Sequence, residues 1–172
     1  KKGIPALEMI RENDYDVLAE CTSGNLKAME YDSGFSHMKT ALERGKPVAT
    51  TNKTAVALKF GELEGLSKAM GVPWYYDGTV VVGAPFLDYA RTCLYEAGIR
   101  AFEGTLSSTC NYVLDSLTGG ASLDQALMDA QRSGMAESDP SLDIEGWDTA
   151  AKAMIVAQAL MDAPCPELGS FP

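Results

Sequence analysis

The feature that most constrains the fold is a regular alternation of helix-like and strand-like segments near the start of the chain. Gly45 and Gly71 follow two of the helix-like segments, and glycine is the residue that most often ends a helix. Strands separated by helices are typical of a parallel sheet, so the sequence predicts an α/β fold. The predicted segments, in chain order, are helix 4–12, strand 14–21, loop 22–25, helix 36–44, strand 47–51 and helix 53–70.

After Gly71 the strict alternation ends, and the pattern predicts an α+β unit in which helices cover a second sheet. Ser122 is a good N-cap for one of its helices. The last helix should begin between Asp143 and Gly146 and run to about Asp162, and 164–172 should be a linker or a cut end. The other predicted segments are strands 74–76, 79–82 and 99–106 and helices 85–97, 107–117 and 122–132.

Composition excludes several classes of protein. The net charge is -10 and the sequence pI is near 4.5, which argues against nucleic-acid binding. The apolar runs are too short to cross a bilayer, and the start of the chain shows no signal peptide. The four cysteines are scattered and His37 is the one histidine, so we predict neither a zinc site nor a disulfide framework. We expect a cytoplasmic protein, with His37 as a surface or packing residue.

An acidic stretch precedes the last helix. Five carboxylates fall between Glu137 and Asp148, and Lys152 lies one helical turn after Asp148 on the same face. One interpretation is an exposed ion pair beside acids that favour a helix start. The other is a site, because carboxylates bind the amine of a small substrate and a lysine beside them can move a proton to or from a hydroxyl.

Four blocks, in order along the chain from about Asp14 to Ala163, resemble the homoserine dehydrogenase family. They are Thr51-Asn52-Lys53, the segment 76–80, the segment 103–112 and the segment 135–152. The resemblance implies that 1–52 is the C-terminal part of a Rossmann-type NAD(P)-binding domain and that 53–163 is the catalytic and dimerisation domain. The front of the family's nucleotide domain, with its G-x-G-x-x-G turn, is absent, so we expect the chain to be a segment of a longer enzyme.

The family interconverts L-homoserine and L-aspartate 4-semialdehyde with NAD or NADP, in threonine and methionine biosynthesis. A homodimer and a small amino-acid substrate are therefore implied as well. By position, the resemblance implies that Lys53 and Lys152 are catalytic, that Glu137, Asp143, Asp148 and Thr109 bind the substrate, and that Thr22, Ser23, Asn52 and Lys53 lie near the cofactor.

These residue types suit the reaction. Hydride leaves a carbon while a proton leaves its hydroxyl, so a base must lie beside that oxygen. A lysine acts as a base only when its pKa falls towards neutrality, and a second lysine nearby favours that shift. The residues leave open which of the two lysines transfers the proton.

Four positions depart from the family pattern, and one of them is Asp77, which stands where the family has a glutamate. Val81 and Val82 stand where glycines are expected, and Ser108 stands for the glycine of the N-G-T turn. The family also binds a monovalent cation, which the resemblance would place at Asp77, Val80 and Val82 as a sodium site. These departures keep two alternatives open: an oxidoreductase that acts on another small amino-acid-derived alcohol or aldehyde, and a non-catalytic amino-acid-binding or assembly module.

Overall fold

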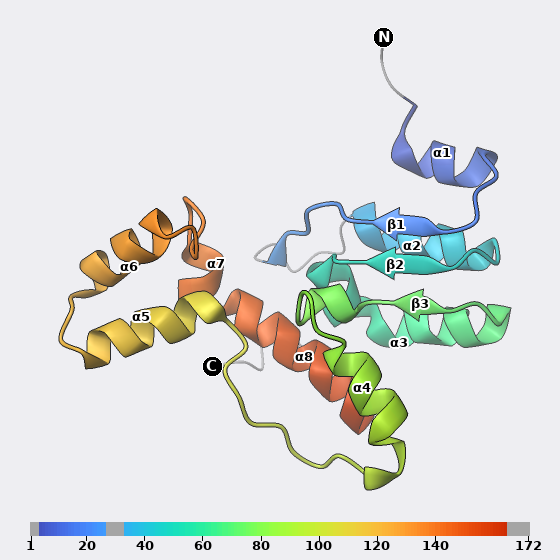
Figure 1. The fold of residues 1–172 in the computed structure, drawn as a ribbon. Coiled ribbons are helices and arrows are strands. Elements are labelled where there is room, and N and C mark those ends of the chain that lie inside the picture. The colour runs from blue at the N-terminus through green and yellow to red at the C-terminus, as the bar shows by residue number, and fades with distance from the viewer. Residues whose placement is uncertain (1–3, 27–32, 165–172) are drawn as a thin grey trace.

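The computed structural model describes residues 4–26 and 33–164, which form a small parallel sheet, covering helices and a helical arm (Figure 1). The elements in chain order are α1 (Ala6–Glu12), β1 (Leu18–Glu20), α2 (Ser33–Glu43), β2 (Val48–Thr50), α3 (Lys53–Met70), β3 (Trp74–Tyr75), the 3-10 turn η2 (Asp77–Thr79), α4 (Phe86–Cys93), the 3-10 turn η3 (Tyr95–Ala97), α5 (Ser108–Thr118), α6 (Leu123–Arg132), α7 (Ser141–Ile144) and α8 (Trp147–Met161).

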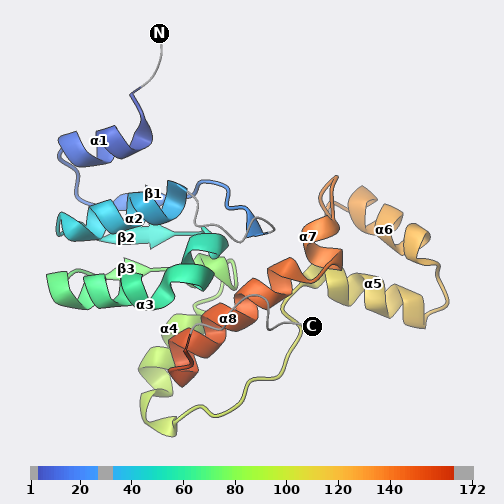
Figure 2. The ribbon, with the colours of Figure 1, turned by 180° about the vertical axis from the view of Figure 1, so that it is seen from behind.

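The three strands are parallel and lie in the order β1-β2-β3. Glu20 pairs with Thr50 across the first two strands, and Val48 pairs with Trp74 across the second and third. All four residues are buried. Glu20 lies 3.5 Å from His37 of α2, and Trp74 donates to Glu64 of α3 at 2.7 Å. The two helices cover the same face of the sheet (Figure 2). The parallel pairing of the three strands, with helices between them along the chain, therefore confirms the predicted α/β class with a Rossmann-like parallel sheet.

Helix α3 connects the sheet to the rest of the molecule. Asn52 caps its N-terminus by accepting a hydrogen bond from the amide of Ala55 at 3.1 Å. Gly71 ends it at φ 65°, a conformation that glycine adopts without strain. One side of α3 packs on α2 and another on α8, so residues at the start of α3 and on α8 come close together.

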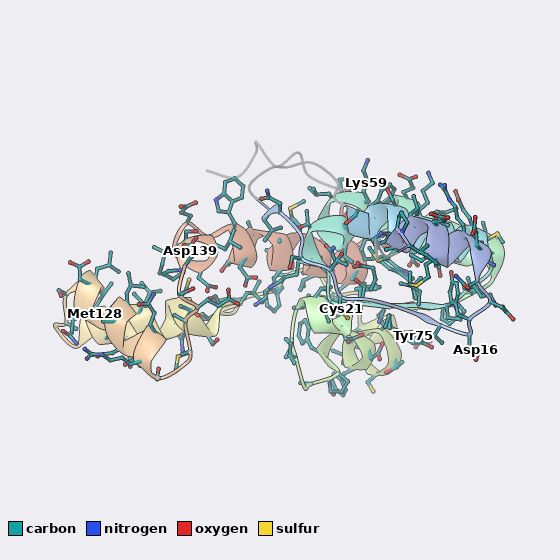
Figure 3. All side chains as sticks on the ribbon, turned by 90° about the horizontal axis from the view of Figure 1, so that it is seen from above. Asp16, Cys21, Lys59, Tyr75, Met128 and Asp139 are labelled. Carbon is teal, nitrogen blue, oxygen red and sulfur yellow. The ribbon has the colours of Figure 1, made fainter. Side chains whose placement is uncertain are left out.

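Helices α5, α6 and α7 form an arm beyond the N-terminal end of α8 (Figures 1 and 2). Seen from above, Met128 and Asp139 mark this arm on one side of the molecule, and Tyr75 lies with the sheet on the other (Figure 3). The predicted helix starts hold here: Ser107 caps α5 and Ser122 caps α6. Gly146, at φ 81°, separates the short α7 from α8, so the acidic stretch forms a helical turn of its own before the last helix.

Two predicted strands are wrong. In 79–82, the amides of Val80 and Val81 both donate to the carbonyl of Asp77 at 3.1 Å, which closes a turn in place of a strand. Residues 99–106 are irregular, and none of the three strands of the described sheet pairs with them. Within residues 4–26 and 33–164, the second sheet predicted for the later part of the chain is therefore not formed.

The parallel sheet continues past the predicted domain boundary. Asn52 was predicted to end the nucleotide-binding domain, but β3, which comes later in the chain, pairs with β2 in the same sheet. The predicted linker 164–172 lies outside the described residues except for Pro164. No helix in the described part of the chain is long and apolar enough to span a membrane.

Candidate active site

The candidate site is centred on Asp148, in the first turn of α8. Its side chain is only 11% exposed, and each of its oxygens lies beside a different lysine. Lys53 Nζ donates a hydrogen bond to Oδ1, and Lys152 Nζ lies 2.8 Å from Oδ2. The sequence paired Asp148 with Lys152 alone, and the packing of α3 on α8 adds the second lysine.

The two lysines lie on different helices, and each is fixed by contacts near its own helix. Lys53 is the first residue of α3, so the Asn52 cap fixes the point from which its side chain leaves. Lys152 lies one turn after Asp148 and also donates to the backbone carbonyl of Leu106 at 2.8 Å. The Lys152 side chain is 15% exposed and that of Lys53 is 33% exposed, so Lys152 is the more enclosed of the two.

The charges explain how Asp148 stays ionised. Burial acts to raise the pKa of the Asp148 carboxyl, but hydrogen bonds from Lys152 and Lys53 and their positive charges outweigh it and lower the pKa below its usual value. One carboxylate thus holds two ammonium groups close together at the edge of a cavity. This arrangement differs from the exposed pair of the alternative interpretation, because Asp148 is buried and doubly bonded.

Both lysines line a cavity of about 490 Å³. Its walls come from the turn after η2, the irregular segment before α5 and the first turns of α3 and α5, which bring together Gly78, Thr79, Val80, Val81, Val82, Thr105, Leu106, Ser107, Ser108 and Asn111. The cavity therefore presents two ammonium groups, hydroxyls and an amide beside an apolar wall. This combination is typical of a site for a small polar molecule.

A larger cavity of about 650 Å³ lies among α5, α7 and α8. Its lining is mostly apolar and includes Leu114, Leu117 and Trp147. Neither lysine reaches it. We place the site at the smaller cavity because the convergent charged groups lie there.

Two of the predicted substrate residues hold the wall of the site together. Asp143 Oδ1 accepts a hydrogen bond at 3.0 Å from Ser107 Oγ, and Ser107 lines the lysine cavity. Thr109 is buried and donates to the carbonyl of Met135 at 3.1 Å, so it ties the start of α5 to the turn after α6. Glu137 is exposed in the connection between α6 and α7, and it lines neither of these two cavities.

The predicted cofactor residues lie at the carboxyl ends of β1 and β2. Ser23 is exposed in the turn after β1, and the carbonyl of Thr22 accepts from Asn52 Nδ2 at 3.2 Å. Asn52 is buried, so it braces the two turns and caps α3. Ligands of parallel α/β sheets bind outside the carboxyl ends of the strands, so Thr22, Ser23 and Lys53 fit the reactive end of a dinucleotide.

One of the three predicted cation ligands, Asp77, has its carboxylate engaged by protein groups. The carboxylate of Asp77 accepts from the amide of Asp88 at 3.0 Å and faces the guanidinium of Arg91 at 3.4 Å. Its charge is therefore already paired by the protein, and a second cation beside Arg91 would be repelled. In the described residues, no group of three or more histidine, cysteine, aspartate or glutamate side chains could hold a metal ion.

Sequence reasoning missed two components of the site. The carbonyl of Leu106 binds Lys152, and a backbone acceptor leaves no signal in a residue pattern. Glu20, at the end of β1, is 2% exposed and lies beneath the Thr22 turn. A carboxylate at the end of a predicted strand, directly after Leu18 and Ala19, was the available signal for it, because such groups are rarely buried without partners.

The fold and the site define a class of protein. A parallel sheet with polar turns at the carboxyl ends of its strands, next to a lysine–aspartate–lysine centre, is typical of a dinucleotide-dependent oxidoreductase that acts on a small polar substrate. Comparison with known proteins narrows this class. The family model for homoserine dehydrogenase matches residues 85–168.

Individual relatives extend the match over nearly the whole chain. An NAD(+)-dependent homoserine dehydrogenase from Pseudomonas canavaninivorans is 39% identical over 155 residues, which are 90% of this chain and 44% of that protein. A homoserine dehydrogenase from Sulfurisphaera tokodaii is 36% identical over 85% of this chain and 47% of its own length. A hyperthermophilic archaeal homoserine dehydrogenase solved with NADPH superposes with a TM-score of 0.82 and 27% identity, covering 95% of this chain and 49% of that one.

The chain belongs to the homoserine dehydrogenase family. It spans between 33% and 47% of the length of these and other curated relatives that it matches.

Proposed function

We propose that this chain supplies the proton-transfer centre of an enzyme that interconverts L-homoserine and L-aspartate 4-semialdehyde with NAD or NADP. The observation that carries the proposal is the pair of lysine ammonium groups held on opposite oxygens of buried Asp148 at the cavity edge. Their position next to the carboxyl ends of the parallel strands supports a role beside the reactive end of a dinucleotide.

The chemistry follows from the two ammonium groups. The dinucleotide, when bound, supplies or accepts the hydride at the substrate carbon. In the reducing direction, a lysine ammonium polarises the aldehyde oxygen and transfers its proton to that oxygen, which becomes the hydroxyl of homoserine. The lysine is then neutral and is reprotonated from solvent. Asp148 keeps the two lysines in place and balances one of their charges throughout.

The carboxylates near the arm would select the amine of the substrate. We propose that Glu137 and Asp143 bind its ammonium group and that Thr109 fixes the turn beside them. The support is that Asp143 already bonds Ser107 in the cavity wall, and that the connection carrying Glu137 is attached to α6 through Gln131 Nε2, which donates to the Glu137 carbonyl at 3.1 Å.

The organisation of the protein is part of the same proposal. Residues 1–52 would belong to the nucleotide-binding domain and 53–163 to the catalytic domain, followed by a linker or cut end. We also propose a homodimer formed through the catalytic domain, and a location in the cytoplasm. Chromatography with light scattering on the full-length protein tests the dimer.

The test of the activity uses the full-length protein that carries this chain. NAD(P)H-dependent reduction of aspartate semialdehyde is followed for the wild type, for Lys152→Ala and for Lys68→Ala. Lys68 is an exposed lysine at the far end of α3 and serves as the matched control. We expect turnover by the wild type and the control, and a loss of about 10²- to 10⁴-fold in kcat for Lys152→Ala. A folded wild type without turnover would overturn the proposal.

One observation favours a second candidate, an oxidoreductase for a related and more apolar substrate. Val80, Val81, Val82 and Leu106 form one wall of the lysine cavity. A panel of small amino-acid-derived aldehydes, assayed beside aspartate semialdehyde, separates the candidates by their kcat/KM values. Tight amino-acid binding without turnover of any of them would instead favour a non-catalytic module.

A further inference from the structure

Glu20 lies at the centre of a buried cluster of polar groups that is separate from the lysine–aspartate–lysine centre. It is the last residue of β1 and is only 2% exposed. One oxygen of its carboxylate accepts from the amide of Thr22 at 3.2 Å and from the Thr22 hydroxyl, and it lies 3.5 Å from Nδ1 of buried His37. The other oxygen accepts from the hydroxyl of Thr50 at 3.5 Å.

The cluster continues to the start of α3. The Thr50 hydroxyl accepts from the amide of Asn52 at 3.0 Å, and Asn52 Nδ2 donates to the carbonyl of Thr22 at 3.2 Å. Asn52 also caps α3, of which Lys53 is the first residue. One carboxylate thus joins the turn after β1, the turn after β2 and the helix that carries a candidate catalytic lysine.

The turn after β1 depends on this attachment. Residues 21–25 are exposed, so little packing holds them from outside. Three hydrogen bonds attach Thr22 of this turn to buried residues: two are accepted by the Glu20 carboxylate, and one is donated by Asn52. Burying a carboxylate is costly unless it gains charge-assisted hydrogen bonds, and here those bonds fix an exposed turn rather than a core contact.

We infer that Glu20 is a positioning residue for the dinucleotide: its carboxylate holds the Thr22–Ser23 turn in the shape that binds the cofactor. The inference rests on the proposed function in one respect, which is that this turn faces the cofactor. At 2% exposure, the Glu20 carboxylate has almost no surface to offer a ligand. It acts through the amide and hydroxyl of Thr22 and, by way of Thr50, through Asn52.

The test measures binding of NADH and NADPH directly, by fluorescence titration of the full-length protein without substrate. Glu20→Ala should weaken binding by about tenfold or more, which corresponds to the loss of one or two charge-assisted hydrogen bonds. Glu20→Gln should bind within about threefold of the wild type, because the amide oxygen of glutamine still accepts from Thr22. Glu43→Ala removes an exposed carboxylate from the last turn of α2 and should leave binding unchanged.

A second variant and a second measurement separate positioning from general destabilisation. Thr50→Val removes the hydroxyl that links Glu20 to Asn52, so it should also weaken binding even if Glu20→Ala fails to fold. Hydrogen exchange should be faster at 21–25 in both variants and unchanged in the arm. Equal affinity of the wild type and the two variants would overturn the inference about Glu20 alone. A folded wild type that binds neither dinucleotide would overturn the proposed function as well.

Discussion

Lys53 and Lys152 come from two different helices and bond opposite oxygens of one carboxylate, that of Asp148. Lys53 begins α3 and Lys152 lies on the second turn of α8, so the pair exists only because these helices pack together. Two like charges held this close require the anion between them. The stability of the centre and its chemistry therefore depend on the same residue.

Asp148→Asn should damage both activity and stability. The amide keeps the shape of the side chain but cannot neutralise two ammonium groups, so they will repel each other and move apart. We expect kcat to fall by about 10²-fold or more and the free energy of unfolding to fall by about 1–3 kcal/mol. Enzyme assay and urea denaturation measure the two effects. Asp16→Asn, exposed in the connection between α1 and β1, is the control and should change neither.

The stabilising effect of Asp148 should depend on pH in a defined direction. The lysines lower the pKa of Asp148 in the folded protein below the usual value of about 3.9. Its contribution is therefore complete above about pH 5 and is lost as the pH falls below about 4 and through the lowered pKa. Urea denaturation of the wild type and Asp148→Asn between about pH 7 and pH 3 should show the difference shrinking in acid. A difference that grows in acid would contradict this assignment.

Because Asp77 is paired with Arg91, we expect the melting temperature of the protein not to depend on which monovalent cation is present. Arg91 bonds the Tyr76 hydroxyl at 2.7 Å and Asp88 at 2.7 Å and faces Asp77, so the protein supplies its own cation there. The melting temperature in sodium, potassium and choline chloride at equal ionic strength should be the same. A stabilisation specific to sodium, present in the wild type and absent in Asp77→Asn, would show that a cation binds despite Arg91.

Replacing Gln158 should lower the stability of the fold more than replacing an exposed glutamine. It is buried in α8 and its side chain donates to the carbonyl of Ala57 in α3 at 2.9 Å, so it joins the two helices that carry the lysines. Gln158→Ala should lower the free energy of unfolding by about 1–3 kcal/mol because a buried hydrogen bond between the helices is lost and a cavity is left. Gln125→Ala, on the exposed face of α6, should stay within about 0.5 kcal/mol of the wild type in the same denaturation experiment.

Local sequence signals predicted the helices well and the later strands badly. Gly45, Gly71, Ser107 and Ser122 act on the backbone next to them, and the structure has each in the expected role. The segments 79–82 and 99–106 have apolar residues suited to strands, but a strand needs a partner for its backbone groups. The described chain offers them none, and composition cannot reveal that.

The sequence by itself determined the α/β order of the first part of the chain, the acidic approach to α8 and the pairing of Asp148 with Lys152. These features depend on periodicities and spacings within one element or between neighbours. The tertiary structure decided that Lys53 joins the same carboxylate, that the Leu106 carbonyl holds Lys152, that Arg91 pairs with Asp77 and that Glu20 lies beneath the Thr22 turn. Those contacts join residues far apart in the chain, and they form only when helix packing and strand order bring the residues together.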